Sequence, residues 1–264
     1  MLRTWIAITA VAGLAIVSAG CEKLKARDNL NRGVRAYENA KFTEAVEYFK
    51  EAVQLDPDFH VARLYLATAY MSQYIPGADS PENLRMAQAA YEEFTKVLEQ
   101  NPKDEVATAH IASLFFTQKK LDEADEWNRK LIALNPQNKE AFYTLGVIAW
   151  TKTFQPRMEA RAKMGMQPED PGPLKDKKVR EELRVKSLPI IEEGIGHLQK
   201  AMSIDPDYDD AMAYLNLLHR ERADLQESAE EYKKDTATAD DWVQRALSTK
   251  KIKAERKPVS AEAK

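Results

Sequence analysis

The sequence predicts an all-α protein in which about five helix pairs stack along the chain. Hydrophobic residues make up 44% of its 264 residues and charged residues 31%, with only nine glycines, a composition that favours helices over sheets. Four related segments also recur around the prolines at 57, 102, 136 and 206. Small residues occupy fixed positions relative to these prolines, which indicates helices that pack closely and end at the proline.

The chain begins with the features of an export signal. "MLRTW" carries a positive charge, "IAITAVAGLAIV" is apolar, and "SAG" places small residues just before Cys21. The apolar run is shorter than the roughly 20 residues that a membrane span requires. Residues 1–20 are therefore predicted to be a cleaved lipoprotein signal peptide; a retained membrane helix is the alternative.

Cys21 is the only cysteine, so the chain cannot form an internal disulfide. The segment "VSAGC" resembles the bacterial lipobox, although Ser18 stands where that family more often has leucine. The resemblance implies a lipid on Cys21, with residues 21–25 as a tether. Because Glu22 follows the cysteine, family analogy implies the periplasmic face of the outer membrane in the bacterial cell envelope. The alternative is a free thiol beside an ordinary cleavage site.

Residues 26–235 contain the repeat. Small residues precede each proline by twelve positions (Ala45, Ala90, Ala124, Gly194) or follow it by ten (Ala67, Ala112, Gly146, and Asn216 in the last unit), and Gly33 opens the second series. These positions resemble the tetratricopeptide repeat, which has Gly or Ala in its first helix, Ala-x-x-x-Phe in its second and Pro at the boundary. The resemblance implies a right-handed superhelix, an α-solenoid with a concave and a convex face.

Two inserts interrupt the repeat. The interval from proline to the next small residue is always ten, whereas the interval from that residue to the next proline is 24, 35, 24 or 60. Both inserts, at about 72–84 and 151–187, therefore lie between the two helices of a pair. The longer one is predicted to be helical, with a helix that ends near Gly165, a second that resumes from Leu174, and a kink at Pro189.

The last repeat is degenerate and leads into a predicted capping helix at 236–249. Thr238 or Asp240 is its expected N-cap, and Trp242 is its large apolar anchor. Residues 250–264 are predicted to be a disordered basic tail. That tail either keeps the protein soluble or contacts anionic lipid or cell wall.

Candidate partner-binding residues follow the small-residue series. The positions four residues later hold Tyr37, Met71, Phe116 and Trp150, and Tyr143 lies earlier on the same face. In the family, this position tends to face the concave groove, which would here be apolar and aromatic and suit an amphipathic helix or an extended apolar segment. The alternative is that these side chains pack between helices. The residues of a known carboxylate-binding subclass are absent, since its positions hold Leu30, Val34, Tyr65, Val106 and His110.

The longer insert is a second candidate for partner binding. Ten basic and six acidic residues lie between Thr151 and Lys186 in an otherwise acidic protein. Arg157, Arg161, Met164 and Met166 are predicted to contact a partner, because methionines adapt to irregular apolar surfaces. The alternative is a solvent-exposed hairpin without a binding role.

Several functional classes find no support in the sequence. The formal charge of -3 and the lack of a basic face argue against nucleic acid. The four histidines lack metal-ligand spacing, and no nucleophile or phosphate-loop motif occurs, so no catalytic residue, metal, cofactor or small-molecule substrate is expected. The sequence favours a membrane-anchored scaffold, not an enzyme, that binds protein or peptide partners in envelope or surface-structure assembly. The alternative is an enzyme or regulator of envelope enzymes whose site is the 151–187 insert.

Overall fold

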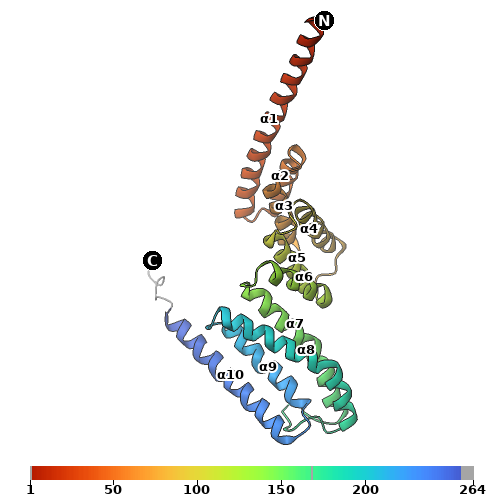
Figure 1. The fold of residues 1–264 in the computed structure, drawn as a ribbon, viewed down its shortest axis with the longest axis vertical. Helices are drawn as coiled ribbons and strands as arrows, with labels where there is room; N and C mark the ends of the chain where they lie inside the picture. Colours follow the sequence, from red (N-terminus) through yellow and green to blue (C-terminus); the bar gives the residue numbers. More distant parts are fainter. Residues whose placement is uncertain (1, 168, 257–264) are drawn as a thin grey trace. The chain divides into compact units, whose positions relative to one another are not determined.

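The computed structural model describes residues 2–167 and 169–256, which are helical apart from short connections (Figure 1). The helices are α1 (Leu2–Glu38), α2 (Phe42–Leu55), α3 (His60–Gln73), α4 (Pro81–Gln100), α5 (Glu105–Thr117), α6 (Leu121–Leu134), α7 (Lys139–Lys163), α8 (Lys177–Ile204), α9 (Asp209–Asp224) and α10 (Ala229–Arg256). The chain divides into two compact units, residues 1–127 and 128–264.

The repeated prolines set the helix boundaries. Helices α2, α4, α6 and α8 each end two residues before one of these prolines, and the next helix begins three residues after it. The residue before proline avoids the α conformation because the proline ring clashes with it. Asp56 and Asp205 accordingly have φ values of -140° and -129°. The five pairs expected from the sequence are therefore present in the described chain.

Two kinds of connection join the helices within a pair. Ala40 and Lys119, each seventeen residues before a repeat proline, make tight turns with φ of 58°. The inserts replace the corresponding turn in the second and fourth pairs. In the fourth pair the insert also lengthens both helices, so that α7 runs through Pro156 and α8 through Pro189. The insert is thus helical as expected.

The core of the first unit consists of two apolar clusters. One joins α1 to α3 around Phe49 and Leu66, and the other joins α3 to α5 around Phe94 and Ile111. Gly33 is required at the close contact between α1 and α2, because a Cβ atom there would lie 2.4 Å from a ring carbon of Phe49. The small residues of the repeat therefore lie where neighbouring helices pack closely.

The core of the second unit lies between α7, α8, α9 and α10. Leu198, Leu215 and Leu218 are fully buried in it, and Trp242 of α10 packs on its edge. At Gly146 a Cβ atom would lie 2.4 Å from Cγ of Leu198. The same small-to-large contact thus recurs in both units.

The ends of the chain differ from the sequence prediction. A separate capping helix at 236–249 is wrong, because α10 is one helix from Ala229 to Arg256. It contains Thr238 and Asp240 internally and takes in the first residues of the predicted tail, while residues 257–264 lie outside the described residues. At the other end, α1 runs from Leu2 to Glu38 across the predicted signal peptide and tether. Within the described residues, no helix combines the length and apolarity needed to span a membrane.

Candidate functional site

In the first unit, the predicted groove residues Tyr37, Met71 and Phe116 are half-buried on α1, α3 and α5. The hydroxyl of Tyr37 lies 2.8 Å from Oγ of Ser72, so it connects α1 to α3. Tyr37 and Met71 also pack on the apolar clusters beneath them. These side chains therefore contribute to packing while part of each surface stays accessible.

Two valines complete the apolar face on which these residues lie. Val61 near the start of α3 is 45% exposed, and Val106 at the corresponding place in α5 is 49% exposed. The sequence prediction did not select Val61 and treated Val106 only as a missing carboxylate-binding position. The sequence did contain a signal for both valines, because each lies ten residues before a predicted groove residue, Met71 or Phe116.

The face carries no charged side chain at its aligned positions. We call it the inner stripe: Val61, Leu64, Thr68 and Met71 on α3, and Val106, Ala109, Ser113 and Phe116 on α5. The hydroxyl of Thr68 donates to the carbonyl oxygen of Leu64, which meets its hydrogen-bonding need within the helix. The inner stripe therefore favours apolar contact over ionic recognition.

In the second unit, Tyr143 and Trp150 of α7 pack against neighbouring helices. The ring of Tyr143 lies 5.2 Å from that of Tyr208 and 5.5 Å from that of Tyr214, and Trp150 lies 5.6 Å from Tyr214. Burial raises the pKa of the Tyr208 hydroxyl to about 12 and also raises the pKa of Tyr143. Here the packing alternative describes the aromatic residues better than a free groove does.

The shorter insert is held in place by Asn83, which the sequence prediction did not select. Its side-chain amide donates to the carbonyl oxygens of Ile75 and Ala78 at 2.8 and 2.7 Å, and its carbonyl accepts the Ile75 N–H at 2.7 Å. Asn83 is 6% exposed. A buried amide with these three bonds fixes the loop from 74 to 80 as an ordered connection.

The longer insert is attached to α9 through buried ion pairs. Arg161 is 1% exposed; its guanidinium donates to both carboxylate oxygens of Asp224 at 2.9 Å and to the carbonyl oxygens of Gln167 and Asp170. Arg157 donates to Asp224 at 2.8 Å and to Glu221 at 2.7 Å. These arginines secure the insert to the scaffold.

The side chains predicted to contact a partner from the insert therefore lie mostly inside the fold. Arg157 and Arg161 point inward because two carboxylates of α9 neutralise them, and Met166 is buried in the apolar core. Met164 is half-buried, and its sulfur accepts the N–H of Asp176 at 3.4 Å. The basic character of the insert was real, but the sequence could not show that its two central arginines have partners more than sixty residues away.

Glu221 is the titratable group most affected by this arrangement. Burial raises the pKa of its carboxyl from 4.5 to about 7, and the neighbouring Arg157 guanidinium offsets only part of that effect. A side-chain hydrogen bond with Trp150 also favours the charged form. Glu221 is one of the two carboxylates that hold the insert to α9. Through its hydrogen bond with Glu221, Trp150, which was predicted to line the groove, also supports that attachment.

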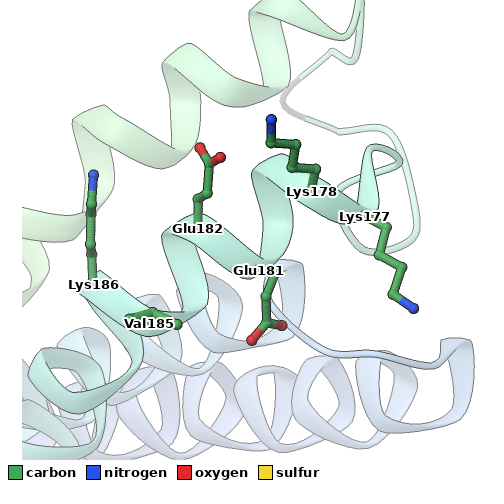
Figure 2. Close-up of a pocket in the computed structure, with 6 residues that line it drawn as sticks. All are labelled: Lys177, Lys178, Glu181, Glu182, Val185 and Lys186. Carbon is green, nitrogen blue, oxygen red and sulfur yellow. The ribbon is translucent and has the colours of Figure 1, made fainter.

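The outer side of the insert presents different residues. Figure 2 shows Lys178, Glu182 and Lys186 on one side of α8, Lys177 and Glu181 on the other, and Val185 between them. Val185 is 68% exposed. These residues of α8 alone line a shallow hollow of about 650 Å³. A second groove, of about 280 Å³, runs between α7 and α8 over Ala160, Val179 and Leu183.

The remaining predicted site is Cys21, which is exposed on α1. Among the residues that the structure describes, no three metal-binding side chains converge. The geometry of the described residues therefore offers surfaces for binding.

Comparison with known proteins agrees with this architecture. A tetratricopeptide-repeat family model matches residues 30–59. No curated protein sequence matches the chain. Among solved structures, MamA from Desulfovibrio magneticus RS-1 is similar over 86% of this chain and 96% of that chain, with 19% identity and a TM-score of 0.57.

A MamA RS-1 double mutant covers 88% of this chain and 97% of that chain, at 18% identity and a TM-score of 0.59. YrrB, described as a repeat protein of this type with an unusual peptide-binding site, covers 84% of this chain and 90% of its own, at 13% identity and a TM-score of 0.50. At identities this low, structural similarity establishes a shared fold and nothing more. The repeat matched at residues 30–59 and the similarity to these structures show that the chain has the all-α fold of tetratricopeptide-repeat proteins, which its sequence predicts.

Proposed function

We propose that the protein is a membrane-anchored scaffold that binds an apolar segment of a protein partner along the inner stripe of its first unit. The observation that carries this proposal is the pair of valines in phase on α3 and α5, each nearly half exposed. Exposed apolar side chains aligned on neighbouring helices suit an apolar helix or extended segment. The unusual peptide-binding site named for YrrB is consistent with this use of the fold.

The inner stripe favours an uncharged ligand surface. Burying a charged group against it would cost free energy, because no opposite charge stands at its aligned positions. A partner segment with apolar residues at every third or fourth position matches the spacing of Val61, Leu64 and Met71. An amphipathic helix is therefore the expected ligand.

The lipid on Cys21 supplies the proposed location, in the bacterial cell envelope on the periplasmic face of the outer membrane. The lipobox-like segment before Cys21 supports this, as does the exposure of that cysteine. Assembly of envelope or surface structures is the proposed process. Replacing Cys21 with Ser should release the protein from membranes; attachment that persists and still requires a lipid on the protein would contradict the anchor.

The groove is tested with Val61→Glu and Val106→Glu together. Each valine exposes about half its surface, so each is expected to contribute about 1 kcal/mol to the complex, and the pair about thirtyfold in affinity. Photo-crosslinking from Ser113 in intact cells would identify the partner, and its affinity would then be measured for purified variants. Helical content by circular dichroism should stay unchanged.

Leu84→Glu is the matched control, since Leu84 is a 51% exposed apolar residue of the same unit that lies outside the inner stripe. Equal weakening by Leu84→Glu, or full affinity of the double variant, would refute binding at the stripe.

A further inference from the structure

The first helix pair differs from the later pairs at two positions that elsewhere are apolar. Counting one residue before and two after the small residue of the first helix gives Arg32 and Arg35 in α1. The corresponding residues of later pairs are buried: Leu66, Ala69, Ile111, Leu114, Leu145, Ile148, Leu215 and Leu218. In α1, two arginines therefore occupy positions that hold buried apolar residues in the later pairs.

These arginines line a hollow of about 250 Å³ between α1 and α2. We call it the arginine hollow; its lining is Arg32, Arg35 and Ala36 from α1, Asn39 and Lys41 from the connection, and Glu44 and Tyr48 from α2. Three cationic side chains face one carboxylate. Lys41 and Glu44 are already paired at 3.6 Å, which leaves two guanidinium groups in excess.

Arg32 is held in position by Tyr48. It donates a hydrogen bond of 2.9 Å to the Tyr48 hydroxyl, and its guanidinium carbon lies 4.3 Å from the centre of the ring. Among the described side chains, neither Arg32 nor Arg35 forms an ion pair, whereas nine other arginines do. A fixed guanidinium fork without a carboxylate is suited to an oxyanion, phosphate above all.

The arginine hollow lies on the same side of α1 as Cys21. Arg32 follows Cys21 by eleven residues and Arg35 by fourteen, which is close to three and four turns and places all three within about 60° of one another around the helix. Lys25 also lies on this side, and so does the opposing charge of Asp28. Leu24, 70% exposed, lies close to the direction of Arg35.

This alignment allows Cys21 and the arginine hollow to contact the same membrane surface. Arg32 lies about 17 Å along the helix axis from Cys21, farther than the roughly 5–7 Å depth of one headgroup layer. A helix that stands upright on the membrane would hold the hollow away from lipid, whereas one that lies along the surface would present Cys21, Leu24 and the arginines together.

We propose that the arginine hollow binds the phosphate of an anionic lipid headgroup, so that α1 lies along the membrane surface. The proposal adds a site to the scaffold function and does not require the lipid on Cys21. Electrostatic attraction to anionic lipid amounts to about a fivefold change in partitioning for each basic side chain near the surface. Loss of both arginines should therefore lower partitioning about thirtyfold.

The test uses the full chain with Cys21→Ser, which removes any lipid attachment. Binding is measured by cosedimentation with phosphatidylcholine vesicles and with vesicles in which one lipid in three is phosphatidylglycerol. The readout is the ratio of the two partition coefficients, because the apolar N-terminal segment contributes to both. Arg32→Gln with Arg35→Gln should lower this ratio about thirtyfold, and circular dichroism checks the fold.

Arg27→Gln is the matched control, because Arg27 is an exposed arginine of α1 about 120° away from Cys21. A fivefold loss of the ratio with Arg27→Gln, the same per charge as for the hollow arginines, would overturn the proposal in favour of diffuse positive charge. An unchanged ratio in the double variant would overturn it outright. Calorimetric titration with inorganic phosphate is the remaining arm: binding that depends on Arg32 and Arg35, without any preference for anionic vesicles, would assign the hollow to free phosphate and refute the lipid.

Discussion

Replacing Arg161 with Met should destabilise the second unit by detaching the long insert from α9. Methionine fills a similar volume but supplies no donor. The substitution removes the charge that neutralises Asp224 and leaves the carbonyl oxygens of Gln167 and Asp170 without the donor that they share. Because Arg161 is 1% exposed and Asp224 is 2% exposed, water does not reach their ion pair in the native packing.

The magnitude follows from these contacts. Removing one partner of a buried ion pair costs about 3–5 kcal/mol, and the lower end applies because Arg157 still donates to Asp224 at 2.8 Å. The two carbonyl oxygens add about 1 kcal/mol together, since a loosened loop regains solvent. We expect a loss of about 4 kcal/mol in the free energy of unfolding.

The assay is urea unfolding followed by circular dichroism, with hydrogen exchange of residues 164–176 as a local readout. Arg184→Met is the control, because Arg184 pairs with Glu227 on the surface and such pairs contribute at most about 1 kcal/mol. Arg161→Lys, which keeps the charge but loses the planar fork, gives a milder variant if the first does not fold. A loss below about 1 kcal/mol for Arg161→Met, with unchanged exchange in the loop, would refute the reasoning.

Three further substitutions test the packing, the loop and the pH dependence. Gly33→Ala should destabilise the first unit by about 1–2 kcal/mol in thermal unfolding, because overpacking against Phe49 at 2.4 Å outweighs the helix propensity gained; a stabilised variant would contradict this contact. Asn83→Ala should cost about 2–3 kcal/mol through three lost hydrogen bonds and speed hydrogen exchange at residues 74–80, whereas unchanged exchange would show that the loop does not depend on Asn83. Burial raises the pKa of Glu221 from 4.5 to about 7, so the folded state binds the extra proton in that window and this group lowers stability as pH rises through it, by up to about 3 kcal/mol. Urea unfolding at several pH values should show that Glu221→Gln lacks this loss, and parallel curves for the two proteins would refute it.

Much of the fold followed from local rules. The repeat prolines indicated where α2, α4, α6 and α8 end, since the α conformation is disfavoured for the residue before a proline. The small residues mark where two helix backbones approach, which the contact of Gly33 with Phe49 illustrates. The interval arithmetic placed both inserts between the helices of a pair, because a repeat that resumes in phase must keep its helices intact.

The candidate site was less predictable because it depends on which way side chains turn. The stripe of Tyr37, Met71 and Phe116 was visible as a helical period, and the exposed Val61 shares that period, but the amount of surface left uncovered depends on neighbouring helices. Tyr143 shows the same pattern, yet it packs between Tyr208 and Tyr214. Periodicity cannot separate these two outcomes.

The sequence by itself determined the helix pairs, their boundaries and the positions of the inserts, because each depends on contacts between residues close along the chain. Only the tertiary structure decided the role of the basic residues. Arg157 and Arg161 became internal attachments because α9 brings Glu221 and Asp224 to them across more than sixty residues. Arg32 and Arg35 have no ion-pair partner in the described chain, since the fold brings no second carboxylate to the arginine hollow beside Glu44. The sequence gives the charge of each arginine, but whether a carboxylate neutralises it depends on the distance between the two groups in the folded protein.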